Sequence, residues 1–145
     1  MTLFAGRAGF GDLPLEAPLP RAGTHDGRSV DTSFALLSLS ESAFNTSGDY
    51  ERFILKDGKR YHHILDPRTG YPVTHTRSVT VLAPSSFLAD TLDTAVFVMG
   101  WEKGMKLIES LPGVEAVIVD AKNQLHVSRG LSSKLRLLRQ PTDGI

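Results

Sequence analysis

The Asp57-Gly58 dipeptide constrains the fold of this chain more than any other local feature. It lies between two apolar and aromatic runs, residues 51–55 and 60–65. Glycine readily adopts the positive φ of a tight β-turn, and Asp-Gly between two such runs is a strong hairpin signal. The sequence therefore predicts an antiparallel hairpin near the middle of the chain, followed by a turn at residues 66–70.

Other segments show the composition of strands. Residues 77–83 alternate and are rich in β-branched side chains, which favours a strand. Residues 114–120 and 124–128 predict a second hairpin around a short turn. Residues 35–40 fit a short strand, and the polar run that includes residues 45–49 is expected to be a loop.

Two helices are expected between the hairpins. The first spans residues 87–99, with a serine N-cap in the Pro84-Ser85-Ser86 segment and an end at Gly100. The second spans residues 102–111 and stops at Pro112-Gly113. In the first helix, an apolar face is expected to consist of Leu88, Leu92, Ala95, Val96 and Met99.

After the short strand at 35–40, the predicted order is strand, strand, strand, helix, helix, strand, strand. Hairpins on both sides of a helix pair indicate an α+β fold with a mostly antiparallel sheet and both helices on one face. At 145 residues the chain has the length of one domain. The expected limits are an irregular segment at 1–33, the domain at 34–130 and a tail at 131–145.

Composition excludes several classes of site. The chain has no cysteine, so disulfides, thiolate metal sites and a cysteine nucleophile are excluded. Sixteen basic and sixteen acidic residues give no net charge, which argues against a general nucleic-acid surface. No run approaches the length of a transmembrane helix, and the first ten residues lack the pattern of an export signal. These features leave the cellular compartment open.

The first helix carries a polar face with candidate ligands. Asp90, Asp93, Thr94 and Phe97 follow the i, i+3, i+4, i+7 spacing and should share one side. A carboxylate and a hydroxyl one turn apart, as in Asp90 and Thr94, are hard oxygen ligands suited to Mg²⁺. A solvated acidic face gives the same pattern, and the spacing by itself does not separate the two interpretations.

Two further polar segments allow more than one interpretation. In a strand, His62 and His63 point to opposite faces, so they are not expected to bind one metal together. A histidine there can act as a general base, contact a phosphate or fill a structural place. Small residues at Thr46, Ser47 and Gly48 would let backbone N–H groups approach an anion, and an ordinary polar turn has the same composition.

These segments together resemble the carboxy-terminal half of the ApbE family. The resemblance runs from about residue 37 to residue 128, and His-Ile-x-Asp-Pro-x-Thr-Gly is its most specific block. The matching blocks stand in the order TSGDY at 46–50, HILDPRTGYP at 63–72, SVTV at 78–81 and ADTLDTA at 89–95. The family consists of Mg²⁺-dependent FAD:protein FMN transferases, which cleave FAD and attach FMN to a threonine of an acceptor protein.

The resemblance implies roles for individual residues. Asp90 and Thr94 are expected to be Mg²⁺ ligands, and His63 rather than His62 the active-site histidine. The residues expected to bind the flavin nucleotide are Thr46, Ser47, Gly48, Asp66 and Thr69.

Family members are longer, and two of their amino-terminal segments, Lys-Gly-x-x-x-Asp and Gly-Gly-Asp, are not found here. Their export signal and anchoring cysteine are not found either. The expected partners are FAD, a threonine-containing acceptor, and a second copy or separate chain that covers the cleft. A non-catalytic FAD and metal-binding module and a structural remnant of the family are the alternatives to an active transferase.

Overall fold

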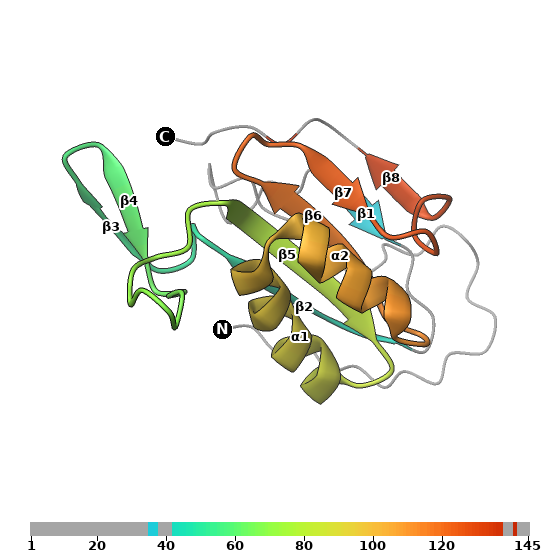
Figure 1. The fold of residues 1–145 in the computed structure, drawn as a ribbon. Coiled ribbons are helices and arrows are strands. Elements are labelled where there is room, and N and C mark those ends of the chain that lie inside the picture. Colours follow the sequence, from blue (N-terminus) through green and yellow to red (C-terminus); the bar gives the residue numbers. More distant parts are fainter. Residues whose placement is uncertain (1–34, 38–41, 138–140, 142–145) are drawn as a thin grey trace.

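The computed structural model describes residues 35–37, 42–137 and 141, and its centre is a four-stranded antiparallel sheet (Figure 1). The strand order is β2-β5-β6-β7. Only between β2 and β5 does the chain form other strands, β3 and β4, before it returns to this sheet. The strands are Ala43–Gly48 (β2), Thr76–Ala83 (β5), Glu115–Asp120 (β6) and Leu125–Val127 (β7). The predicted α+β class with a mostly antiparallel sheet is confirmed.

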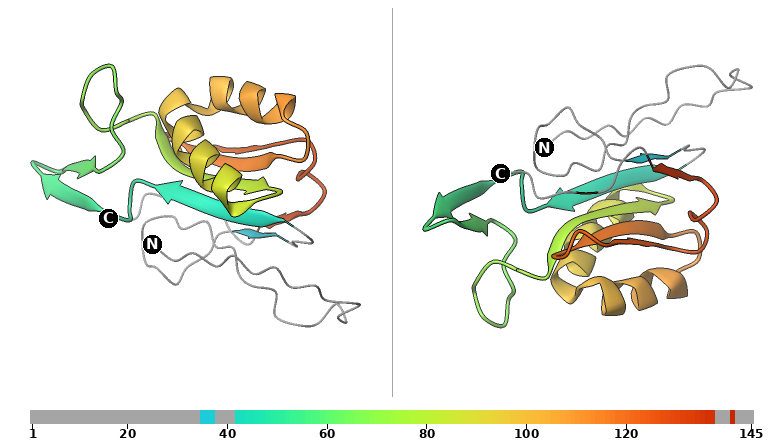
Figure 2. Two further views of the ribbon diagram at one scale, coloured as in Figure 1. Left: turned by 90° about the horizontal axis from the view of Figure 1, so that it is seen from below. Right: turned by 90° about the horizontal axis from the view of Figure 1, so that it is seen from above.

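Two helices, α1 at Ser86–Met99 and α2 at Trp101–Ser110, lie on one face of this sheet (Figure 2). The hydroxyl of Ser85 accepts a hydrogen bond from the backbone N–H of Leu88, and this N-cap fixes the start of α1. Gly100 has a φ of 79° and separates the helices, because this backbone conformation favours glycine. Within the described residues, neither helix is long and apolar enough to cross a membrane.

The predicted central hairpin is confirmed as a separate ribbon, although its strands are shorter than expected. Strands β3 (Phe53–Lys56) and β4 (Lys59–His62) pair antiparallel through a turn in which Asp57 and Gly58 both have positive φ. This ribbon extends away from the four-stranded sheet (Figures 1 and 2). Every side chain of β3 is exposed.

A second two-stranded sheet brings together the first and the last strand of the described residues. Strand β1 (Ala35–Leu37) pairs antiparallel with β8 (Leu135–Leu137). Strand β8 lies in the segment that was expected to be a tail. The irregular segment expected at 1–33 and residues 38–40 of the first predicted strand lie outside the described residues.

The core has one layer on each side of the four-stranded sheet. The larger layer lies between the sheet and the helices, and it includes Val79, Val81, Val96, Phe97 and Ile118, none of which is exposed to solvent. The smaller layer covers the opposite face around Leu82, Val117 and Leu131. Both layers follow from the two-residue alternation of β5 and β6.

The expectation of a loop at residues 45–49 was wrong. These residues belong largely to β2, which pairs with β5 from Ala43↔Ala83 to Gly48↔Ser78. The polar composition suggested a turn, but the hydrogen bonds with β5 hold the segment in a strand. Its polar side chains remain partly accessible at this edge of the sheet, so polar residues are tolerated there.

The expected apolar face of α1 was also partly wrong. Ala95 and Met99 are exposed, whereas Phe97, which was assigned to the polar face, is fully buried. The buried residues are Ala89, Leu92, Asp93, Val96 and Phe97. The side of the helix that the sheet covers determines the buried face, and here that side includes the carboxyl group of Asp93.

Candidate functional site

Strand β2 and helix α1 bring four polar side chains together. Asn45 and Ser47 are two residues apart and therefore point to the same face of the sheet, towards α1. The amide nitrogen of Asn45 donates a hydrogen bond to Oδ1 of Asp90. The hydroxyl oxygens of Ser47 and Thr94 are 3.0 Å apart and share a hydrogen bond. The helical spacing of Asp90 and Thr94 and the alternation of β2 thus produce one cluster.

Asp93 is a fifth member of this cluster and is completely buried. Its Oδ1 accepts a hydrogen bond from the hydroxyl of Thr94 at 3.1 Å, while its Oδ2 is buried without a hydrogen-bond partner in the described structure. Burial raises the pKa of the Asp93 carboxyl from 3.8 to about 6, although hydrogen bonds from Thr94 and Ser47 oppose the increase. The nearby charge of Asp90 raises this pKa further.

The cluster has the chemistry of a site for a hard divalent cation. Its accessible groups are a carboxylate, an amide and two hydroxyls, whose oxygens match the preference of Mg²⁺. The buried, unpartnered oxygen of Asp93 adds negative charge beneath them. Within the described ranges, no three His, Cys, Asp or Glu side chains are grouped to hold a metal, so a cation at this cluster would need hydroxyl or amide donors beside Asp90.

The raised pKa of Asp93 predicts a pH dependence of stability in metal-free protein. The carboxyl ionises near pH 3.8 when unfolded but only near 6 when folded, so the free energy of unfolding should fall as the pH rises between these values. Asp93→Asn should remove this loss and stabilise the protein above pH 6. The gain is at most about 3 kcal/mol, at about 1.4 kcal/mol per pKa unit. Urea unfolding of both proteins in EDTA measures it; parallel pH profiles would contradict the prediction.

The structure separates the three residues of the predicted nucleotide-binding segment. The side chain of Ser47 belongs to the cluster with Thr94, whereas the hydroxyl of Thr46 is 2.9 Å from that of Thr80 on the opposite face. Gly48 is buried, and a Cβ atom there would lie 2.4 Å from the ring of Tyr50. A side chain at position 48 would therefore displace this tyrosine.

The two neighbouring histidines lie in different surroundings. His62 is buried at the end of β4; its Nε2 is 2.7 Å from the carbonyl oxygen of Val73, and its ring packs edge-on against Phe97 of α1. His63 is exposed, and its Nδ1 is 3.3 Å from the carbonyl oxygen of Arg52. Among the residues that the structure describes, no hydrogen bond joins His63 to the cluster on β2 and α1.

Asp66 and Thr69 stabilise the turn that follows the ribbon. The carboxylate of Asp66 accepts hydrogen bonds from the backbone N–H and the guanidinium of Arg68. These hydrogen bonds lower the pKa of Asp66 to about 2. The hydroxyl of Thr69 accepts a hydrogen bond from the backbone N–H of Tyr71. The turn expected at 66–70 is confirmed, with Gly70 at positive φ.

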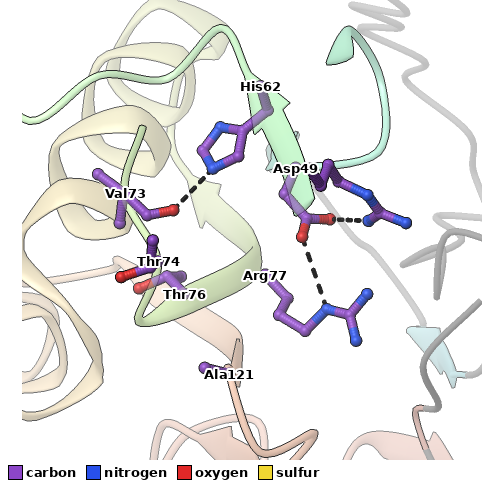
Figure 3. Close-up of a pocket in the computed structure, with 8 residues that line it drawn as sticks. Asp49, His62, Val73, Thr74, Thr76, Arg77 and Ala121 are labelled. Carbon is purple, nitrogen blue, oxygen red and sulfur yellow. Dashed lines mark hydrogen bonds and ion pairs between the residues drawn. The ribbon is translucent and has the colours of Figure 1, made fainter. Parts of the chain in front are cut away.

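A second polar region lies where the ribbon joins the sheet, around a cavity of about 210 Å³ (Figure 3). Asp49, directly after β2, forms ion pairs with Arg60 of β4 at 2.8 Å and with Arg77 of β5 at 3.6 Å, so one carboxylate links the end of β2 to both strands. Arg77 also donates to the side-chain oxygen of Asn123. The lining residues are Asp49, Arg60, His62, Val73, Thr74, Thr76, Arg77 and Ala121. This network fixes the base of the ribbon, and with it the segment that carries His63.

The sequence did not identify Asn45 and Asp93 as members of the cluster on β2 and α1. Asn45 was assigned to a loop, and only a strand assignment would have placed it on the same face as Ser47. Asp93 was placed on the polar face of the helix, but its burial depends on how α1 packs against the sheet. The i, i+2 spacing of Asn45 and Ser47 was the signal available for the first of these residues.

Comparison with known proteins identifies the family. The model of the ApbE family matches residues 15–118. An FAD:protein FMN transferase of Treponema pallidum is 43% identical over 104 residues, which are 71% of this chain and 29% of that protein. One from Klebsiella pneumoniae is 41% identical over 108 residues, covering 74% of this chain and 33% of that protein. The chain thus spans about a third of the length of these relatives.

Solved structures agree with this comparison. The crystal structure of the ApbE protein from Thermotoga maritima is 40% identical and has a TM-score of 0.68, covering 79% of this chain and 37% of that one. The flavin transferase ApbE from Vibrio cholerae is 36% identical with a TM-score of 0.54, covering 64% of this chain and 30% of that one. The fold, the matched blocks and these relatives show that the chain belongs to the ApbE family.

Proposed function

We propose that this chain provides the cation-binding part of a flavin transferase, which cleaves FAD and attaches FMN to a threonine of an acceptor protein. The observation that carries the proposal is the convergence of the oxygens of Ser47, Asp90 and Thr94, with the amide group of Asn45 bonded to Asp90. The names of the relatives, FAD:protein FMN transferase, support the choice of reaction.

The proposed reaction breaks the pyrophosphate bond of FAD and needs charge stabilisation at the phosphate oxygens. A Mg²⁺ ion held by Asp90 and Thr94 would neutralise negative charge on these oxygens. Asn45 orients the carboxylate of Asp90 through its hydrogen bond. Asn45 therefore helps to fix the ligand geometry before substrate binds.

We assign the proton transfer to His63. An exposed histidine can accept the proton of an acceptor threonine hydroxyl as this oxygen attacks phosphorus, and histidine is the most common side chain in this role. The exposure of His63, next to the rigid junction of the ribbon, supports the assignment. His62 has a packing role in this proposal, since its ring is buried against Phe97.

The nucleotide itself is proposed to contact residues 46–48 and the turn that contains Asp66 and Thr69. In the relatives, these segments belong to proteins about three times as long as the matched region. The ribbon exposes the large apolar side chains of Ile54 and Leu55, which are 66% and 62% accessible, and Tyr71, after the following turn, is 70% accessible. This exposure supports the proposal that another polypeptide segment, from a second copy or a separate chain, covers the cleft.

Binding of FAD with and without Mg²⁺ tests the proposal. We expect Mg²⁺ to strengthen FAD binding, measured by flavin fluorescence, and a slow release of AMP to appear by chromatography when a threonine-containing acceptor is present. Binding of FAD without AMP release would instead favour a non-catalytic FAD and metal-binding module. Failure to bind FAD under either condition would contradict the proposed function.

A further inference from the structure

The carboxyl group of Asp93 lies in the core directly beneath the proposed cation site. We propose that Asp93 is a positioning residue, which accepts the hydrogen bond of the Thr94 hydroxyl so that the oxygen of Thr94 presents a lone pair to the cation. This inference rests on the proposed function, because it concerns the same site. It assigns a role to a residue that does not itself touch the cation.

The geometry provides the first reason. The Thr94 hydroxyl donates to Oδ1 of Asp93 at 3.1 Å, and its oxygen lies 3.0 Å from the hydroxyl of Ser47. Thr94 is exposed, whereas Asp93 is not accessible to solvent at all. The hydrogen bond therefore runs from the accessible oxygen into the protein interior.

Counting protons and lone pairs provides the second reason. A threonine hydroxyl has one proton and two lone pairs. When this proton lies in the hydrogen bond to Asp93, it cannot point at an incoming cation. Ser47 is then the donor in its 3.0 Å contact with Thr94, which occupies one lone pair of the Thr94 oxygen and leaves the other available. Without an acceptor in the interior, the proton of Thr94 would turn freely and oppose a positive ion in part of its orientations.

The cost of burying Asp93 provides the third reason. A buried carboxylate with an unsatisfied oxygen destabilises a protein, and Oδ2 of Asp93 has no hydrogen-bond partner in the described structure. The hydrogen bond from Thr94 reaches Oδ1 and does not satisfy Oδ2. A carboxylate that orients a ligand and adds charge below a cation explains why the site contains this group.

A double-mutant cycle with Mn²⁺ as the probe tests the inference. The proteins are the wild type, Asp93→Ala, Thr94→Val and the double variant, and free Mn²⁺ is measured by electron paramagnetic resonance in mildly alkaline buffer. Alanine is used because the amide oxygen of an asparagine would still accept the hydrogen bond of Thr94. Asp93→Ala should weaken Mn²⁺ binding about 10-fold, as loss of an outer partner of a metal ligand typically does. In the Thr94→Val background the same change should weaken binding less than about twofold, because the hydroxyl is absent.

Two further proteins complete the design. Thr94→Ser keeps the hydroxyl, so the effect of Asp93→Ala should return in this background. Asp120→Ala is the matched control: it also removes a buried carboxyl, but that group accepts hydrogen bonds from the backbone N–H groups of Lys122 and Gln124 on the β6–β7 turn, and Mn²⁺ binding should stay unchanged. Circular dichroism verifies folding, and Asp93→Leu, which also has no acceptor, replaces Asp93→Ala if the latter does not fold.

The outcomes separate this inference from the proposed function. Equal weakening by Asp93→Ala in the wild-type and Thr94→Val backgrounds would overturn the positioning role, since the effect would not pass through the hydroxyl. Unchanged Mn²⁺ affinity in Asp93→Ala would overturn it as well, while leaving the cation site intact. A wild-type protein that binds no Mn²⁺ would overturn the proposed function and this inference together.

Discussion

Replacing Asp90 with alanine is expected to abolish Mg²⁺-dependent binding and cleavage of FAD. Asp90 supplies the accessible carboxylate of the cluster, and the remaining donors of Asn45, Ser47 and Thr94 are uncharged. Hard cations bind weakly to sites without carboxylates, so the affinity for Mg²⁺ should fall on the order of 100-fold or more. Isothermal titration calorimetry with Mg²⁺ measures this loss directly.

Stability measurements provide the control for Asp90→Ala. Asp90 is exposed, and its replacement should change the free energy of unfolding by less than about 1 kcal/mol. Glu102→Ala removes another exposed acid, at the start of α2, and should leave Mg²⁺ binding unchanged. Mg²⁺ affinity that is the same in Asp90→Ala and wild type would show that the cation binds elsewhere.

Replacing His62 with alanine should destabilise the fold by about 2–4 kcal/mol, the range for loss of a large buried side chain with its hydrogen bonds. The His62 ring packs against Phe97 with a centroid distance of 5.6 Å and is hydrogen-bonded at both nitrogens, to the carbonyl of Val73 and the backbone N–H of Ile64. Removal leaves a cavity and two unpaired backbone groups. Urea unfolding at neutral pH measures the change.

The neighbouring residue is the matched comparison. His63 is exposed, so His63→Ala should alter the free energy of unfolding by less than about 0.5 kcal/mol. It should instead lower FMN transfer to the acceptor, because His63 is the proposed base. The opposite pattern, with a stable His62→Ala protein that has lost transfer, would exchange the roles assigned to the two histidines.

The sequence predicted elements well where local signals mark their ends. Ser85 and Gly100 bound α1, and Asp57-Gly58 forms the turn of the ribbon, because caps and tight turns depend on only a few neighbouring residues. Strand β2 was missed because its polar residues resemble a loop. Its pairing with β5 joins residues 30 to 40 positions apart, and local composition carries no information about such a contact.

The same distinction applies to the candidate site. The one-turn spacing of Asp90 and Thr94 was visible in the sequence, and the structure brings both into one cluster. The contribution of Asn45 depends on the pairing of β2, and the burial of Asp93 depends on how α1 packs against the sheet. Both are tertiary properties. The opposite environments of His62 and His63 were expected from strand alternation. The packing of His62 against Phe97 could not be predicted in this way, because it depends on where the ribbon lies relative to α1.

Paramagnetic relaxation by Mn²⁺ in ¹⁵N-labelled protein tests the central claim, that the β2–α1 cluster holds a divalent cation. Mn²⁺ broadens the amide signals nearest to it, so substoichiometric addition reports where it binds. The predicted result is broadening centred on residues 45–47 and 90–94, reversed by excess Mg²⁺, with the amides of the β6–β7 turn unaffected. Broadening centred on Asp66 or Asp120 instead, or no site-specific broadening, would contradict the account.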